Sequence, residues 1–180
     1  MSAPASWRDR IKVHEAADLF PMMSDDELRE LGEDIRKHGL KLNLAFFVND
    51  RHINGLHDMR GAADQAVEIE RRKDRGELPL LDGRNRLDAM QIVCILDEKR
   101  ITALLKSAKI CWADDQTAEA FVASLNAHRR HLKPEQKREI IAKLLKAHPE
   151  KSDRAIAKEA GASPQTVGRT RAKSNVPTET

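Results

Sequence analysis

Three short apolar runs predict the strands of a small sheet in the amino-terminal two thirds of the chain. Residues 43–48 are apolar and aromatic, residues 78–81 form a second run, and residues 108–113 form a third. Runs of this length with bulky side chains are typical of buried strands. Residues 11–14 alternate between apolar and polar side chains, which indicates a further short strand.

Helical spacing of apolar residues separates these runs. Ser24 precedes Glu27 by three positions in a capping-box pattern, and the helix that it begins is predicted to end at Gly39. A second helix is predicted over 61–75, where a cluster of charged residues indicates a solvated face and carries no assigned role. A third follows residue 82 and continues through Ile95.

From residue 117 onward the pattern is entirely helical. Helices are predicted over 117–126 and from Pro134 to the break at His148 and Pro149. The segment from about 152 to 173 has the pattern of a helix-turn-helix, with Gly161 at the turn. We therefore divide the chain into residues 1–118 and 119–180. The apolar positions that the helix pair must bury are Ile156, Ala160, Ala162 and Val167.

The strand over 78–81 leads directly into a turn with the composition of an anion site. Gly83 permits close backbone approach, and Arg84 and Arg86 supply guanidinium groups at the start of the next helix. The alternative is an ordinary solvated helix start whose arginines pair with Asp82 and Asp88.

Charge is distributed unevenly over the chain. The net charge is +3, yet residues 126–175 hold 13 Lys and Arg against 5 Asp and Glu, a net charge of +8. This basic end is typical of nucleic-acid binding. Aromatic residues make up 3% of the chain and tyrosine is absent, which argues against a single-strand binder built on base stacking.

Two cysteines and the absence of a long apolar stretch predict a reduced, cytoplasmic protein that does not enter a membrane. Cys94 and Cys111 lie among apolar residues and are predicted to be buried and inert.

A helix-turn-helix places the start of its second helix in the DNA major groove. That geometry puts one group of side chains near base edges and another near phosphates. The expected base-contacting residues are Gln165, Thr166, Arg169 and Arg171, and the expected phosphate-contacting residues are Arg154, Lys158 and Lys173. The alternative is an ordinary helical hairpin at the end of the domain.

Three segments, in this order, resemble the ParB/sulfiredoxin superfamily over most of the chain. The first is 19–40, with its proline-containing strand end, helix and Gly-Leu turn. The second is the turn at Gly83, and the third is 126–134, which is similar to the third ParB box.

The resemblance implies an α+β fold, with a ParB/sulfiredoxin-like domain that has a small mixed sheet, followed by an all-helical helix-turn-helix region. It implies a nucleotide-responsive DNA-binding protein of plasmid, phage or chromosome partition or of transcriptional regulation, associated with the nucleoid or a plasmid. Its partners would be double-stranded DNA, a nucleotide triphosphate (CTP or ATP, with Mg2+), a second copy in a homodimer and a partner ATPase. The implied nucleotide-binding residues are Gly83, Arg84, Asn85, Arg86, Asn126 and Arg129.

The chain departs from the superfamily pattern at three positions. Arg84 occupies the position of the catalytic cysteine of sulfiredoxins, so sulfiredoxin activity is not expected. Asp88 replaces a usual arginine, and Leu125 replaces a glutamate that serves the metal and nucleotide turnover in the family. Weak CTPase or ATPase activity is therefore left open.

Two other hypotheses remain. One is an ATP-using enzyme of the same superfamily, a nucleotide hydrolase, nuclease-like protein or small-molecule kinase, in which Asp82, Asp88 and Glu98 would matter. The other is a DNA-binding regulator whose nucleotide pocket is inactive. His128 and His131 share a helical spacing but lack a third ligand nearby, so no metal site is predicted.

Overall fold

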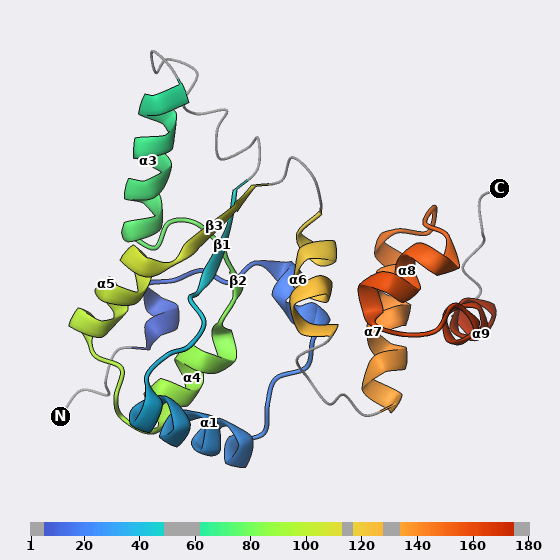
Figure 1. Cartoon of the computed structure of the whole chain (residues 1–180), viewed down its shortest axis with the longest axis horizontal. Helices are drawn as coiled ribbons and strands as arrows, with labels where there is room; N and C mark the ends of the chain where they lie inside the picture. The colour runs from blue at the N-terminus through green and yellow to red at the C-terminus, as the bar shows by residue number, and fades with distance from the viewer. Residues whose placement is uncertain (1–5, 49–61, 113–116, 128–133, 175–180) are drawn as a thin grey trace. The chain divides into compact units, whose positions relative to one another are not determined.

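The computed structural model in Figure 1 resolves two compact units. The first comprises Met1–Ala17 and Met22–Asp115, and the second comprises Asp18–Pro21 and Gln116–Thr180. The structure describes residues 6–48, 62–112, 117–127 and 134–174.

The described elements define a mostly helical α+β protein with a small mixed sheet, which confirms the predicted class at that level. The elements through the last strand are η1 (Trp7–Asp9), η2 (Glu15–Leu19), α1 (Asp25–His38), β1 (Ala45–Val48), α3 (Ala62–Asp74), β2 (Leu80–Asp82), α4 (Arg84–Ile92), α5 (Glu98–Ser107) and β3 (Lys109–Trp112). Those that follow are α6 (Ala118–Ala127), α7 (Pro134–Ala147), α8 (Asp153–Ala160) and α9 (Pro164–Ser174).

The sheet of the first unit has the strand order β2-β1-β3. Strand β1 is antiparallel to β2 and parallel to β3, with Ala45 opposite Lys109. The predicted strand over 11–14 is present only as a parallel bridge between Val13 and Leu80. Because β1 is buried at every position, the apolar run over 43–48 is explained by its central place in the sheet.

Helix α1 begins and ends as its sequence predicts. The Ser24 side chain accepts a hydrogen bond from the Glu27 amide at 3.4 Å, and the Glu27 carboxylate accepts one from the Ser24 amide at 2.7 Å. Gly39 ends the helix with φ of 74°, a left-handed value that favours glycine. Leu28 and Ile35 of this helix are buried, in agreement with the helical spacing of its apolar residues.

The core of the first unit includes a residue that the sequence pattern did not indicate. Trp7 is 1% exposed, and its indole Nε1 donates to Asp88 Oδ1 at 2.8 Å. The amino-terminal segment is thereby attached to α4. The largest other fully buried side chains of this core are Ile11, Leu44, Phe46, Ile69, Leu78, Leu80, Leu87, Met90 and Leu105.

The segment after α4 differs from the predicted helix through Ile95. Helix α4 ends at Ile92, and Cys94 has φ of 56°, a left-handed conformation that interrupts helical hydrogen bonding. Asp97 then caps α5 by accepting a hydrogen bond from the Arg100 amide at 2.7 Å. No element was predicted here, although this cap and the apolar spacing from Ile101 to Leu105 are helical signals.

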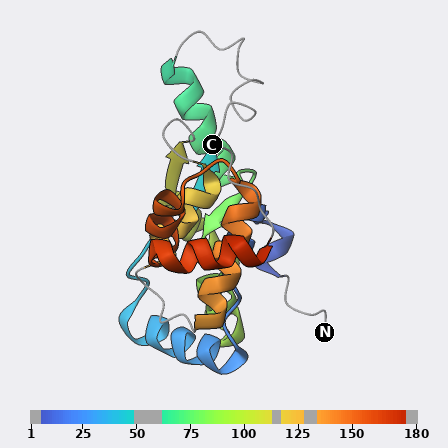
Figure 2. The same cartoon turned by 90° about the vertical axis from the view of Figure 1, so that its right-hand side faces the viewer.

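The second unit is helical in its described residues. Helices α7, α8 and α9 pack against one another, and α6 packs against α8. In Figure 1, α9 lies on the side of α7 away from α6, and in Figure 2 it runs across α7. The helix predicted from Pro134 is present as α7, and its apolar stripe is buried; the residues of this stripe are Ile140, Ile141, Leu144 and Leu145. Within the described residues, no helix has both the length and the apolar character required to span a bilayer.

Candidate functional sites

The turn between β2 and α4 is built around Gly83. This glycine has φ of 125°, and a Cβ atom added to it would lie 2.4 Å from Leu44 Cδ2. Any larger residue would strain the backbone and collide with a fully buried leucine. As the N-cap of α4, Gly83 supplies no side-chain hydrogen bond, and the first turn of α4 contains no acidic residue. No carboxylate in the first helical turn of α4 therefore neutralises the positive end of its dipole.

Arg86 is held within the turn by internal partners. Its guanidinium donates to Asp82 Oδ2 at 2.6 Å and to the Leu42 carbonyl oxygen at 2.6 Å. The Arg86 side chain is 13% exposed and that of Asp82 is 19% exposed. The pairing with Asp82 agrees with the alternative interpretation of this motif. An anion at the turn would compete with Asp82 for this guanidinium.

The remaining predicted residues of the turn are arranged differently. Asn85 Oδ1 accepts a hydrogen bond from the Met23 amide at 3.3 Å, which links the start of α4 to the segment before α1. The Arg84 side chain is half-buried. One turn thus contains Gly83, Arg84, Asn85 and Arg86, and the Asn85 side chain is used for a hydrogen bond within the protein.

The other predicted nucleotide-binding residues lie apart in sequence. Asn126 belongs to α6 of the second unit, where its Nδ2 donates to the Val122 carbonyl oxygen at 2.9 Å. Arg129 lies outside the described residues, as do His128 and His131. Among the residues that the structure describes, no group of His, Cys, Asp and Glu has the arrangement of a metal site.

Each carboxylate of the enzyme hypothesis is paired with an arginine. Asp82 accepts from Arg86, Asp88 accepts from Arg8, and Glu98 accepts from Arg10. The hydrogen bond that Arg8 donates to Asp88 is the main cause of the raised pKa of Arg8. These ion pairs give each of the three carboxylates a structural role.

The helix pair at the carboxyl-terminal end has the capping expected of a helix-turn-helix. Ser152 caps α8 by accepting from the Ala155 amide at 3.3 Å, and Gly161 ends it in the left-handed conformation, with φ of 59°. Ser163 Oγ accepts from the Thr166 amide at 3.2 Å at the start of α9. The turn chemistry therefore follows the sequence pattern at both helix ends.

Packing of the pair also follows the prediction, with one difference. Ile156, Ala160 and Val167 are buried, whereas Ala162 is half-buried. Gly168 brings α9 against the first turn of α8, because a Cβ atom there would lie 2.9 Å from Asp153 Oδ2.

Most of the predicted DNA-binding side chains are accessible. The exposed side chains are those of Arg154, Lys158, Gln165, Arg169 and Lys173. Within the described residues, none of these five side chains has a hydrogen-bond or ion-pair partner. Thr166 is half-buried, and its Oγ1 lies 2.9 Å from Ser163 Oγ within the cap of α9.

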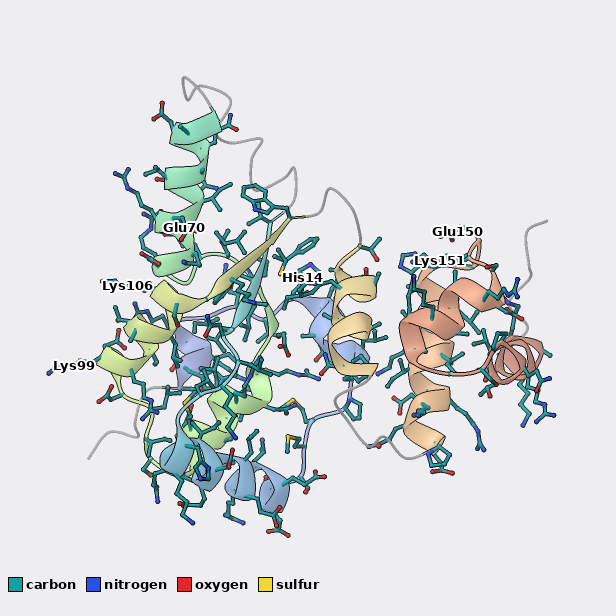
Figure 3. The ribbon with its side chains drawn as sticks, in the orientation of Figure 1. His14, Glu70, Lys99, Lys106, Glu150 and Lys151 are labelled. Carbon is teal, nitrogen blue, oxygen red and sulfur yellow. The ribbon has the colours of Figure 1, made fainter. Side chains whose placement is uncertain are left out.

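Arg171 is the exception and corrects the prediction that it approaches base edges. It is 5% exposed, and its guanidinium donates to Asp153 Oδ1 at 2.8 Å. It also donates to the carbonyl oxygens of Pro149 at 3.1 Å and Lys151 at 2.6 Å. Lys151, labelled in Figure 3, itself pairs with Glu159 at 2.8 Å. Arg171 thus fixes the loop before α8 to α9, and its position in sequence alone did not reveal this contact.

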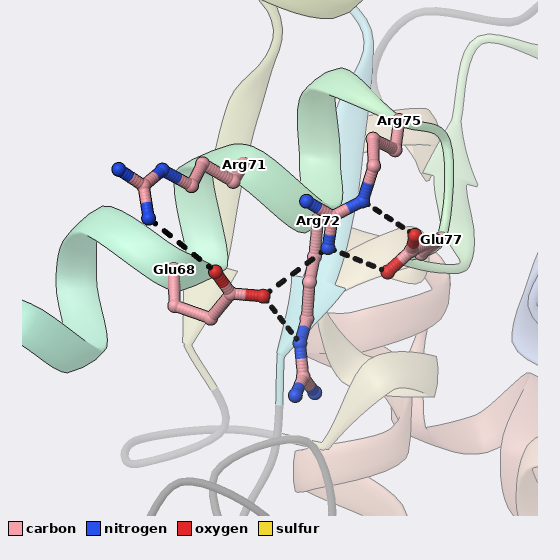
Figure 4. Close-up of polar contacts among 5 residues, drawn as sticks. All are labelled: Glu68, Arg71, Arg72, Arg75 and Glu77. Atoms are coloured by element: carbon pink, nitrogen blue, oxygen red, sulfur yellow. Dashed lines mark hydrogen bonds and ion pairs between the residues drawn. The ribbon is translucent and has the colours of Figure 1, made fainter. Parts of the chain in front are cut away.

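The other basic run of the chain, on α3, is neutralised locally. In Figure 4, the Glu68 carboxylate lies among the guanidinium groups of Arg71, Arg72 and Arg75. Glu68 Oε1 lies 3.1 Å from Arg75 and 3.4 Å from Arg72, and Arg75 pairs with Glu77 at 2.5 Å. The hydrogen bond from Arg75 is the main cause of a lowered pKa of Glu68. This network accounts for the charges as a local, partly exposed ion-pair cluster, and no binding role is assigned to it.

The cysteines differ from their predicted burial. Cys94 is exposed and Cys111 is only half-buried. Burial is the main cause that raises the pKa of the Cys111 thiol to about 11. Its thiolate is scarce at neutral pH, so Cys111 is a poor nucleophile.

Comparisons of this chain with protein-family models, with curated proteins and with solved structures found no match.

Proposed function

We propose that this protein binds double-stranded DNA through the helix-turn-helix formed by α8 and α9. The observation that carries the proposal is the pair of capped helices joined at Gly161, with exposed polar side chains along α9. Such a pair presents its second helix to the major groove while the first crosses the phosphate backbone.

Surface charge supports the same proposal. Arg154 and Lys158 are one helical turn apart on α8, and Arg169 and Lys173 are one turn apart on α9. All four are exposed and have no carboxylate partner among the described residues, in contrast to the arginines of α3. Free cations release condensed counterions when they meet DNA phosphates, which supplies much of the affinity.

The salt dependence of duplex binding tests the proposal. We expect the logarithm of the affinity of the full chain for a duplex to fall linearly with the logarithm of the salt concentration. Replacing Arg154 or Lys158 by alanine should reduce the slope by about 0.9 for each phosphate that the side chain neutralises. Arg29→Ala, an exposed and paired arginine on α1, is the control and should leave the slope unchanged. Equal slopes in all the variants would contradict the proposal.

A second proposed activity is nucleotide binding at the turn of Gly83, which would make the DNA binding responsive to CTP or ATP with Mg2+. It is supported by the glycine N-cap with φ of 125° and by the lack of an acidic residue in the first turn of α4. Arg84 would supply charge to the phosphates, and Arg86 would exchange Asp82 for them. Asn126 and Arg129 remain proposed contributors from the later part of the chain.

The same proposal includes the fold family of the first unit and the biological role of the protein. The succession of capped helix α1, strand β2, the Gly83 turn and α4, followed by a helix-turn-helix, supports a ParB/sulfiredoxin-like fold for the first unit. We propose a role in plasmid, phage or chromosome partition or in transcriptional regulation, with association to the nucleoid or a plasmid. A homodimer and a partner ATPase are part of that proposal.

Equilibrium binding of CTP and ATP, with and without Mg2+, tests the nucleotide activity. Arg84→Ala should weaken binding, because it removes a cation from the turn without removing the Asp82–Arg86 ion pair. Arg86→Ala should weaken it further. Lack of binding by the unaltered chain would reject the nucleotide site and leave the DNA proposal intact. Turnover of bound ATP without DNA binding would favour the enzyme hypothesis.

A further inference from the structure

The exposed polar side chains of α9 form a single stripe. Gln165, Arg169 and Lys173 are exposed and follow one another at intervals of four residues. Residues at this spacing lie on the same face of a helix. Val167 and Arg171 lie on the buried side. The face that α9 presents to a partner is therefore defined by these three polar residues.

Internal contacts remove the other polar candidates from this face. Arg171 is bound to Asp153 and to the loop before α8, as described above. Thr166 is engaged with Ser163 in the cap, and Thr170 Oγ1 donates to the Thr166 carbonyl oxygen at 2.9 Å. Gln165 and Arg169 are left as outward side chains that can form paired hydrogen bonds with a base edge.

Their positions along α9 assign different roles to the three exposed residues. Gln165 is the second residue of α9, Arg169 follows one turn later, and Lys173 lies in the last turn. At a rise of 1.5 Å per residue, positions four apart are separated by about 6 Å along the helix axis. Base pairs are stacked about 3.4 Å apart, so this separation covers at most about two base-pair steps, and fewer when the helix is inclined to the duplex axis. Lys173, at the far end of the helix, is left to contact a phosphate.

We infer that the DNA target of this protein contains an adenine bound by Gln165 and a guanine bound by Arg169, within about two base-pair steps of each other in the major groove. Gln forms paired hydrogen bonds with adenine N6 and N7, and Arg forms them with guanine O6 and N7. The inference rests on the proposed DNA-binding function and adds the bases that α9 recognises. Of the two arginines predicted near base edges, it retains Arg169 and excludes Arg171 as the guanine-contacting residue.

Selection of duplexes from a randomised pool, with the full chain as bait, tests the inference. The unaltered chain should enrich a motif that contains adenine and guanine at this separation. Gln165→Ala should lose the preference at the adenine alone, and Arg169→Ala should lose it at the guanine alone. Each loss should be on the order of 10-fold or more in relative affinity for the preferred base. Lys173→Ala is the matched control, which should bind more weakly yet enrich the same motif.

The outcomes separate the inference from the function on which it rests. A motif that neither Gln165→Ala nor Arg169→Ala alters would overturn the base assignment while DNA binding remained. Binding without any enriched motif would do the same. Failure of the unaltered chain to bind any duplex in the pool would overturn both. Circular dichroism of each variant, compared with the unaltered chain, establishes that a reduced preference does not come from unfolding of α9.

Discussion

Replacing Arg171 by methionine should destabilise the second unit, although Arg171 lies on the proposed DNA-binding helix. Arg171 is 5% exposed, and its guanidinium donates to three acceptors, which belong to Asp153, Pro149 and Lys151. Methionine retains much of the apolar length of the side chain but donates no hydrogen bond, so the acceptors lose their partner. The change therefore isolates the polar contribution of this residue.

The expected loss follows from the geometry of these contacts. A hydrogen bond that involves a charged group contributes about 1.5 to 3 kcal/mol, and breaking a buried ion pair by removing one partner costs about 3 to 5 kcal/mol. The Asp153 side chain is 35% exposed, so water can replace part of what it loses. We therefore expect a loss of about 3 kcal/mol in the free energy of unfolding, at the lower end of the range for buried pairs.

Urea denaturation followed by far-ultraviolet circular dichroism measures this loss. The matched control is Arg169→Met, which makes the same substitution at an exposed arginine two positions away and should change stability by less than about 0.5 kcal/mol. Trp7 and Trp112 both lie in the first unit, so tryptophan fluorescence reports separately on that unit. Equal destabilisation by the two substitutions would refute the structural role assigned to Arg171.

Three further predictions concern the first unit. Gly83→Ala should destabilise it by about 2 kcal/mol or more in thermal unfolding, because φ of 125° and the contact with Leu44 both oppose a Cβ atom; an unchanged midpoint would contradict the described turn. Ser24→Ala should lower the free energy of unfolding by about 1 kcal/mol through loss of the α1 N-cap. Ser107→Ala is the control, because Ser107 is the last residue of α5 and caps no helix start; it should cost less in the same assay. Iodoacetamide at pH 8 should modify exposed Cys94 well before Cys111, because the pKa of the Cys111 thiol is raised to about 11. The folded state holds the Cys111 thiol proton more tightly than the unfolded chain does. The contribution of Cys111 to the free energy of unfolding should therefore decline as pH rises from about 9 towards 11. Peptide mapping of the modified protein checks the order of labelling, and faster modification of Cys111 would contradict its burial.

Features determined by neighbouring residues were predicted well from the sequence. The capping box at Ser24 and Glu27, the left-handed turn at Gly161 and the strand over 43–48 depend on local hydrogen bonds or on an uninterrupted apolar run. These signals act over a few residues, so the sequence pattern contains them in full. Helix α5 had the same kinds of signal at Asp97 and was nonetheless missed.

Features determined by tertiary contacts could not be predicted in the same way. Whether Arg171 faces DNA or the protein depends on the position of Asp153 and on the close approach that Gly168 permits. The hydrogen bond from Arg86 to the Leu42 carbonyl oxygen likewise depends on how the turn folds, whereas the pairing of Arg86 with Asp82 was one of the two alternatives that the sequence left open. Composition identifies the groups that can bind an anion, and only the fold decides which of them already have partners.

The most direct test of the proposed DNA-binding function is a nuclear magnetic resonance titration of the nitrogen-15-labelled full chain with the duplex selected by that chain. We predict that backbone amide resonances of α8 and α9 shift together, with the largest changes from Gln165 to Arg169, while those of α3 remain in place. This pattern would locate the DNA on the helix-turn-helix. Shifts confined to the first unit, with α9 unaffected, would contradict it.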